Sequence, residues 1–493
     1  MSMLMFQFTS AVPFKSLITQ GNISRPDEDP FYIPKEGYEK LKLGEVINYR
    51  KLTQPLGILY FEMKVESTYQ FLVRSEDSFG NPNAIVTTVM VPHNADPSKI
   101  LSYQAAVDAA DPNCAPSYAL QLGSDPGTWL TTNIEQLFSQ AGLYEGWIVV
   151  IPDFLGPKSA FCVGLQAAHA TLNSLRAVTA SGDITGVNKD AEIVLWGYSG
   201  GTQPTVWSAT LFEQYAPELN IIGAAAGGVL VNPNNIAHLT MGGIFSGLVV
   251  NAINGFGNEY GDLNDFIKDN IYKEVQDKFF KARTQCLVPS LIETFYTTWE
   301  DISPLGDKLL EAPLFKKYIE INNLLNLNAT PSVPFFFYNS QDDEIIPPAD
   351  ADDLYDKWCA QGVTIEYHQD EIGEHITQAV AGSGLAFNWI KRRLTGATLE
   401  KECKKTISFS NILNLEGFGS FAEILGDALS TIHEKEIGPK SPTSSVLISN
   451  TTVTHKSSSS SSASTIVASK TSSNATSTAT SSSLLGSLIG LIF

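Results

Sequence analysis

The sequence predicts an α/β protein in which a buried, mostly parallel sheet is interrupted by an inserted helical segment. Two observations support this prediction. Short apolar runs rich in β-branched and aromatic residues, typical of strands covered on both faces, alternate with longer stretches that have helical periodicity. In addition, about 100 residues in the middle of the chain contain no clear strand. The apolar runs are 146–151, 193–196, 335–338 and 363–367.

The composition indicates a large globular domain with appendages. The chain has 493 residues, of which 43% are hydrophobic, so it can bury an extensive core. Charged residues make up only 17%, and the formal net charge is −20. Because nucleic-acid binding requires a basic face, this balance argues against a nucleic-acid partner. It is typical of the solvated acidic surface of an extracellular protein.

The elements divide the chain into successive parts. Residues 1–25 are expected to be a poor or truncated signal region. Their apolar patch is short and no positive charge precedes it, so they match a signal peptide poorly. Residues 26–232 are expected to form the first part of the core, starting with an antiparallel hairpin of 69–75 and 84–91 around a Gly-Asn-Pro-Asn turn. The core continues over 332–400 and is followed by a C-terminal extension, 401–440.

The inserted segment, 233–331, is expected to form a helical cap. Two amphipathic helices are predicted in it, and their faces are assigned to packing or, for part of the first helix, to an apolar tunnel for substrate. The first face comprises Ile244, Phe245, Leu248, Val249, Ala252, Ile253 and Phe256, and the second Leu263, Phe266, Ile267, Ile271, Val275 and Phe279.

Residues 441–493 are compositionally distinct. Residues 441–483 contain 27 Ser or Thr in 43 positions and no aromatic residue, which predicts an extended, O-glycosylated stalk over 441–475. Small residues at 472–476, a polar spacer and an apolar run at 484–493 match a glycosylphosphatidylinositol attachment signal over 476–493. The apolar run is too short to span a bilayer. We therefore expect a secreted or cell-surface protein, with possible membrane or cell-wall attachment through a C-terminal lipid anchor.

Four glycosylation sequons agree with a secretory route. The sequons start at Asn22, Asn328, Asn450 and Asn474, and the five cysteines are Cys114, Cys162, Cys286, Cys359 and Cys403. The cysteines show neither a CxxC pair nor a Cys/His metal spacing, so no zinc site is expected. Their odd number allows at most two disulfide bonds, and the spacing does not determine the pairing.

A candidate nucleophile lies between a predicted strand and a predicted helix. The pentapeptide Gly197-Tyr198-Ser199-Gly200-Gly201 follows the apolar run 193–196 and precedes a helix-like stretch with Pro204 in its first turn. In a nucleophile elbow the serine sits on a strained strand-to-helix turn, where the residues two before and two after must be small. Ser199 is therefore the predicted nucleophile.

A serine nucleophile needs a base, and the base needs a carboxylate to orient it. Of the seven histidines, only His368 and His375 follow late strands of the predicted sheet. His375 lies in a loop before the last helix of the core, whereas His368 lies at the end of a strand, so His375 is favoured. Asp342 and Asp343 directly follow the run 335–338, which gives the order Ser, Asp, His; Asp343 is favoured over Asp342.

The oxyanion of a tetrahedral intermediate needs two donors. The backbone N–H of Gly200, next to the nucleophile, is the first. The second is expected from the loop after an early strand, a place occupied by residues 102–108.

Five ordered blocks of sequence resemble the secreted lipases of yeasts, the family of Candida antarctica lipase A. The resemblance extends from about residue 29 to the region of Cys403. The blocks are Ser102-Tyr103-Gln104 through Asp108 to Cys114-Ala115-Pro116-Ser117-Tyr118, Gly197-Tyr198-Ser199-Gly200-Gly201, Tyr215-Ala216-Pro217-Glu218-Leu219-Asn220, Asp343-Glu344-Ile345-Ile346-Pro347 and Glu374-His375-Ile376-Thr377.

This resemblance implies an α/β-hydrolase fold with a helical cap and hydrolysis of acylglycerols by a triad of Ser199, Asp343 and His375. It also implies an oxyanion hole of Asp108 and Gly200. An ionised carboxylate would repel an oxyanion, so Asp108 would act through its N–H or as a protonated acid. The disulfides implied are Cys114–Cys286 and Cys359–Cys403, with Cys162 free.

The sequence departs from the family pattern in two places. Val107 stands where a relative has an acid beside Asp108, and the Ser/Thr-rich stalk with its apolar end is an added part.

We expect the protein to be a serine-dependent lipase that acts on a lipid or ester substrate at an oil–water interface. The expected reaction needs no cofactor and no metal. The sequence also fits two alternatives: a short-chain esterase or peptidase on the same fold, and a catalytically inactive cell-surface binding protein.

Overall fold

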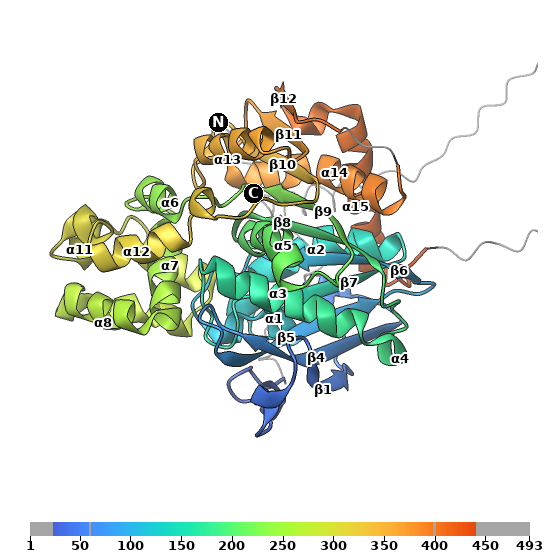
Figure 1. Ribbon diagram of the computed structural model, residues 1–493, viewed down its shortest axis with the longest axis horizontal. Coiled ribbons are helices and arrows are strands. Elements are labelled where there is room, and N and C mark those ends of the chain that lie inside the picture. The colour runs from blue at the N-terminus through green and yellow to red at the C-terminus, as the bar shows by residue number, and fades with distance from the viewer. Residues whose placement is uncertain (1–22, 59–60, 398–400, 440–493) are drawn as a thin grey trace, which may run out of the picture. The chain divides into compact units, whose positions relative to one another are not determined.

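A ten-stranded sheet forms the centre of the fold (Figure 1). The computed structural model describes residues 23–58, 61–397 and 401–439. In spatial order the strands are β1 (Val46–Lys51), β4 (Ser67–Glu76), β5 (Pro82–Val91), β7 (Trp147–Pro152), β6 (Asp96–Gln104), β8 (Glu192–Tyr198), β9 (Ile221–Gly227), β10 (Phe335–Ser340), β11 (Ile365–Asp370) and β12 (Lys404–Ser408). The predicted stalk, the predicted attachment signal and most of the predicted signal region lie outside the described residues.

The sheet is antiparallel at its N-terminal edge and parallel elsewhere. β1, β4, β5 and β7 pair antiparallel, and every pair from β7 and β6 through β11 and β12 is parallel. The predicted hairpin is confirmed as β4 and β5. A separate two-stranded sheet consists of β2 (Gly57–Ile58) and β3 (Phe61–Glu62).

Helices cover both faces of the sheet. The side chains of β10 show this by alternation, since Phe335 and Phe337 contact Trp358 of α13 (Pro348–Ala360), whereas Phe336 contacts Trp389 of α14 (His375–Leu394). With α13 lie α3 (Gly164–Thr179) and α5 (Thr202–Tyr215), which share its apolar core. With α14 lie α15 (Leu415–Ile432) and α2 (Pro126–Tyr144). α1 (Pro116–Ala119) and α4 (Gly182–Thr185) are single turns.

The segment between β9 and β10 is helical, and Figure 1 shows it projecting from one side of the sheet. Its helices are α6 (Pro233–Thr240), α7 (Ser246–Glu259), α8 (Gly261–Asn270), α9 (Gln276–Phe280), α10 (Leu287–Thr294), α11 (Trp299–Ile302) and α12 (Pro313–Ile321). We call these helices and the turns between them the cap.

The first amphipathic helix predicted in the cap corresponds to α7, but the second is shorter than expected. α8 ends at Asn270 because Ile271 is extended, with φ −97° and ψ 133°. The next backbone N–H, that of Tyr272, donates to the carbonyl of Ile302 instead of continuing the helix. The helical spacing of apolar residues continues past Asn270, but this hydrogen bond to a distant residue ends the helix there.

The C-terminal extension belongs to the same sheet. β12 pairs in parallel with β11, and α15 packs against α14 and α2. A disulfide between Cys359 of α13 and Cys403 holds the start of β12 at this edge. Within the described residues, no helix combines the length and the apolar character that crossing a membrane requires.

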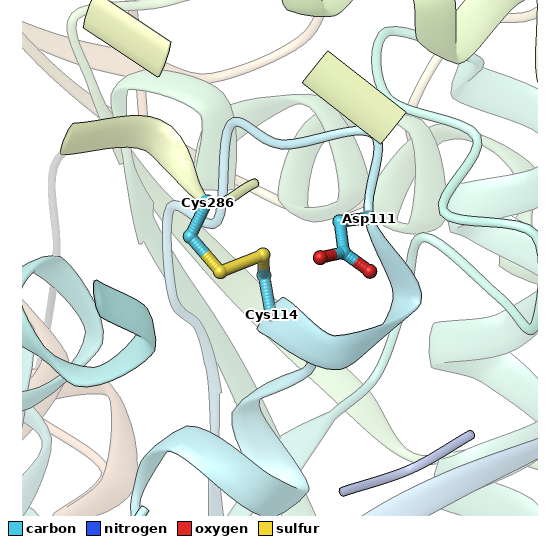
Figure 2. Close-up of side chains that lie close together, drawn as sticks. All are labelled: Asp111, Cys114 and Cys286. Carbon is cyan, nitrogen blue, oxygen red and sulfur yellow. A yellow bond between two sulfur atoms is a disulfide. The ribbon is translucent and has the colours of Figure 1, made fainter. Parts of the chain in front are cut away.

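A second disulfide joins the cap to the core. Cys114 ends a 3-10 turn, Pro112–Cys114, that follows β6, and Cys286 directly precedes α10. Figure 2 shows the bond with the carboxylate of Asp111 beside it. The two cysteines are 172 residues apart in sequence, so the bond closes a long loop and restricts the unfolded chain. Cys162 is free and buried.

Candidate active site

Ser199 lies on a sharp turn between β8 and α5. Its backbone is left-handed, with φ 52°, which is unfavourable for a residue with a side chain. The flanking glycines make the turn possible. A Cβ on Gly197 would lie 2.2 Å from the carbonyl oxygen of Gly201, and a Cβ on Gly201 would lie 1.9 Å from that of Gln104. The geometry is that of the nucleophile elbow expected from the sequence.

The structure brings together the three residues predicted as nucleophile, base and acid. Nε2 of His375 is 2.7 Å from Oγ of Ser199, and Nδ1 of His375 is 2.7 Å from Oδ2 of Asp343. The other oxygen of Asp343 accepts the backbone N–H groups of Ile345 and Ile346 at 3.0 and 2.7 Å. The Asp343 side chain is 0% exposed, so its orientation toward the imidazole is fixed by contacts that water cannot replace.

Two further residues hold His375. Its backbone N–H donates to the carboxylate of Glu344 at 2.7 Å, and its carbonyl accepts the hydroxyl of Tyr198 at 2.6 Å. The rings of Tyr198 and His375 are 5.1 Å apart between centroids. Sequence reasoning did not assign these roles, although both residues are direct neighbours of predicted site residues.

The alternatives considered for base and acid do not reach Ser199. Asp342 is exposed, and its backbone N–H donates to the hydroxyl of Ser340. His368 lies within β11, and its Nε2 is 3.2 Å from the carboxylate of Glu366.

Asp108 lies directly against the residue after the nucleophile. A Cβ on Gly200 would be 1.7 Å from Oδ1 of Asp108, so the carboxyl group occupies the space that the missing side chain leaves. The backbone of Asp108 is also left-handed, with φ 48°. Burial raises the pKa of Asp108 to about 6, and nearby His375 opposes this rise. The carboxyl is therefore neutral over a wider acidic range than an exposed aspartate.

A second carboxyl group lies beneath this loop, on α2. Glu135 accepts the backbone N–H of Ala106 with both oxygens, at 3.1 and 2.9 Å. Burial raises its pKa to about 8, with a smaller contribution from the charge of Asp108. The sequence did not identify Glu135, because an acid within an ordinary helical stretch carries no motif.

An apolar cavity opens at Ser199. Side chains of the cap form one wall and those of the core the other. The residues lining it are Asp108, Phe161, Cys162, Ser199, Gly200, Leu230, Pro233, Ile236, Ala237, Leu248, Val249, Ala252, Ile345 and Ile346. Asp108 is the one ionisable carboxylate among them, and the remaining walls are almost entirely hydrocarbon. Part of the first predicted cap helix, α7, thus lines an apolar space in addition to packing on the core.

One cluster of potential metal ligands occurs among the described residues. The ligand atoms of Asp111, Cys114 and Cys286 lie within 4.8 Å of one another. Both sulfur atoms are joined in the disulfide (Figure 2). Since a cysteine binds metal as a thiolate, this donor set does not fit a metal ion while the bond is intact.

Fold and site together define a serine hydrolase of the α/β-hydrolase fold. A family model described as secretory lipase matches residues 120–401. Lipase 1 of Candida albicans is 38% identical over 426 residues, which are 85% of this chain and 91% of that protein. Lipase 2 of the same organism is 41% identical over 80% of this chain and 86% of that protein. Lipase A of Arthroderma benhamiae is 39% identical over 84% of this chain and 89% of that protein.

Solved structures agree with these relatives. The chain is similar to the X-ray structure of Candida antarctica lipase A, with a TM-score of 0.74 and 26% identity over 85% of this chain and 99% of that one. A rice cell wall degrading esterase from Xanthomonas oryzae, 15% identical with a TM-score of 0.55, shares the fold. The chain belongs to the secretory lipase family and is an ester hydrolase.

Replacing Asp343 separates the two candidate acids. Asp343→Asn keeps the shape of the side chain but leaves the wrong tautomer of His375 favoured, so we expect kcat for an ester substrate to fall by about 10³–10⁴-fold. The matched control, Asp342→Asn, removes the adjacent exposed carboxylate and should leave kcat within about twofold. Steady-state hydrolysis of a p-nitrophenyl ester measures both. Equal losses in the two variants would contradict the assignment.

Proposed function

We propose that this chain hydrolyses acylglycerols through an acyl-enzyme on Ser199. His375 removes the hydroxyl proton as Oγ attacks the ester carbonyl carbon, and Asp343 stabilises the resulting imidazolium. The tetrahedral intermediate collapses when His375 donates the proton to the leaving alcohol. Water, activated by the same imidazole, then releases the fatty acid. The 2.7 Å hydrogen bonds on both sides of the imidazole support this sequence of steps.

The oxyanion is stabilised by the backbone N–H of Gly200 and by Asp108. The close contact between these two residues supports a shared role. Because the pKa of Asp108 is raised to about 6, its side chain is neutral below that pH and can then donate a hydrogen bond. Above that pH its contribution comes from the backbone N–H, since an ionised carboxylate would repel the developing charge.

The single observation that favours a lipid substrate is the apolar cavity at Ser199. Residues 233–331 act as a cap whose helices α6 and α7 cover this cavity. Hydrocarbon walls stabilise a fatty acyl chain by burial, whereas a peptide would leave its polar backbone unsatisfied there. The natural location of such substrates is an oil–water interface.

Loss of the nucleophile tests the proposal. Ser199→Ala should fold normally and lose at least ~10³-fold of the rate of fatty-acid release from emulsified triglyceride. Ser208→Ala is the control serine substitution, because Ser208 is buried within α5, the helix that follows Ser199. Titration of released acid at constant pH measures both variants. Retained activity in Ser199→Ala would refute the mechanism. A preference for short esters or an aminoacyl amide over long-chain esters would refute the proposal that the substrate is a lipid.

We also propose that the chain is attached to the cell surface through a C-terminal lipid. The order of small residues at 472–476, a polar spacer and the apolar run 484–493 supports a glycosylphosphatidylinositol signal. The Ser/Thr-rich stalk would hold the enzyme away from the surface.

Enzymatic release tests the anchor. Intact expressing cells treated with phosphatidylinositol-specific phospholipase C should release esterase activity into the medium. A variant with Leu488→Asp and Leu491→Arg disrupts the apolar run, so its activity should no longer be retained at the cell surface or respond to the phospholipase. Lipid anchoring would be contradicted if the esterase activity stayed at the cell surface both after phospholipase treatment and in the double variant.

A further inference from the structure

The oxyanion-hole residue Asp108 is held by the cap as well as by the sheet. Its carbonyl oxygen accepts a hydrogen bond from Nδ2 of Asn251 on α7 at 2.8 Å. Asn251 is 0% exposed and is 143 residues away in sequence. Since Asp108 has a left-handed backbone that costs free energy, a buried contact at its carbonyl is placed where it can determine the direction of that peptide.

The amide of Asn251 is itself oriented. Its Oδ1 accepts the hydroxyl of Ser290 on α10 at 2.7 Å, and Ser290 is 1% exposed. A carboxamide has one acceptor side and one donor side. The carbonyl oxygen of Asp108 can only accept, so the NH₂ group of Asn251 faces it, and Oδ1 is left to accept the hydroxyl of Ser290.

One face of α7 carries this contact together with two others. Asn258, seven residues after Asn251, donates to the carbonyls of Ala110 and Ser159 at 2.9 and 3.2 Å. Between them, Gly255 lets the helix approach the chain closely, because a Cβ there would lie 2.5 Å from the carbonyl oxygen of Phe161. Positions four and seven residues apart share a helix face, so this face of α7 is docked against two loops, the one after β6 that carries Asp108 and the one after β7 that carries Ser159.

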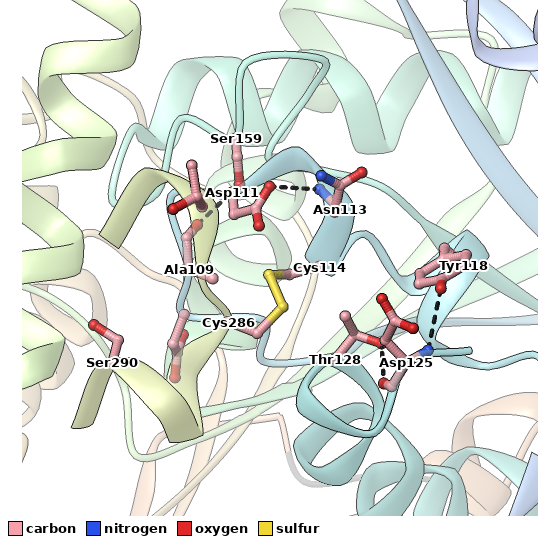
Figure 3. The surroundings of a disulfide bond; sticks show 12 residues. Ala109, Asp111, Asn113, Cys114, Tyr118, Asp125, Thr128, Ser159, Cys286 and Ser290 are labelled. Atoms are coloured by element: carbon pink, nitrogen blue, oxygen red, sulfur yellow. Dashed lines mark hydrogen bonds between the residues drawn. A yellow bond between two sulfur atoms is a disulfide. The ribbon is translucent and has the colours of Figure 1, made fainter. Parts of the chain in front are cut away.

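The disulfide closes the arrangement. Figure 3 shows Cys114–Cys286 with Ala109, Ser159 and Ser290 around it. Cys114 follows Asp108 in the same loop, and Cys286 precedes Ser290 by one helical turn. The disulfide thus joins the loop that carries Asp108 covalently to the start of α10. The same helix is also linked to Asp108 by hydrogen bonds, from Ser290 to Asn251 and from Asn251 to the carbonyl of Asp108.

We propose that Asn251 is a positioning residue for the reaction. By holding the carbonyl of Asp108, on the peptide that follows this residue, it keeps the backbone of Asp108 in its left-handed conformation, so that the N–H of Asp108, on the preceding peptide, faces the oxyanion. The inference rests on the proposed role of Asp108. The side chain of Asn251 bonds to Asp108 and Ser290 and not to the nucleophile or the base. Asn251 therefore stabilises the transition state indirectly, through the position of Asp108. Its loss should lower kcat and leave KM nearly unchanged, because the apolar walls that bind the acyl chain remain.

The experiment compares Asn251→Ala with Asn254→Ala. Asn254 is the same residue type on the same helix and is also 0% exposed, but its side chain bonds Val250, Phe279 and Arg283 instead of Asp108. We expect kcat of Asn251→Ala to fall about 10- to 100-fold, less than the loss for a deleted oxyanion donor, with KM within about threefold. Asn254→Ala should keep kcat within about twofold.

Binding of an alkylboronic acid gives a readout that a purely structural role would not move. The boron accepts Oγ of the nucleophile and forms a tetrahedral adduct that resembles the intermediate. Its Ki should rise in Asn251→Ala by about the factor by which kcat falls, and should not change in Asn254→Ala. Thermal unfolding of both variants checks that each is folded.

Three results would overturn the inference: unchanged kcat in folded Asn251→Ala, an unchanged Ki, or equal losses in the Asn254→Ala control. If Asn251→Ala does not fold, Ser290→Ala replaces it, because that variant releases the amide while leaving Asn251 in place. Its kcat should fall by at least about threefold, and an unchanged kcat overturns the inference. Activity retained in Ser199→Ala would instead refute the proposed function itself.

Discussion

The left-handed turn at Ser199 is the constraint on which the site depends. Three backbones meet there so closely that glycine alone fits at positions 197 and 201. The unfavourable φ of Ser199 costs about 1–2 kcal/mol, and the packing of β8 and α5 on either side must offset it. In return, Oγ projects at the end of the sheet, where His375, the first residue of α14, reaches it.

Much of this arrangement could be predicted from the sequence because it depends on local patterns. The buried strands are short apolar runs, the elbow is a pentapeptide, and the order Ser199, Asp343, His375 follows from strands that end at one edge of a parallel sheet. The position of each acid after its strand favours Asp343 over Asp342 as the orienting carboxylate; in the structure the side chain of Asp343 is buried, and Asp342 is exposed.

What could not be predicted depends on contacts between distant segments. The second cap helix ends early because Tyr272 bonds to Ile302, although its apolar period continues. Glu135 and Asn251 lie in ordinary helical stretches, and their importance comes from backbone groups of a loop far away in sequence. Neither carries a motif, so only the fold reveals them.

The cap and core together make the reaction site. In the proposed mechanism the core supplies the nucleophile, the base and the acid. The cap supplies one wall of the apolar cavity and a hydrogen bond to the loop of Asp108. The disulfide between Cys114 and Cys286 ties the two parts beside that loop. The cap is therefore a structural part of the site as well as its cover.

In the proposed reaction one activated hydroxyl, that of Ser199, forms the covalent intermediate. Incubation with an alkyl phosphonate ester followed by peptide mass spectrometry tests it directly. We expect one phosphonate per chain, located on Ser199, with loss of activity in proportion to labelling. Complete inactivation with the label on another residue, or no label on folded and active enzyme, would contradict it.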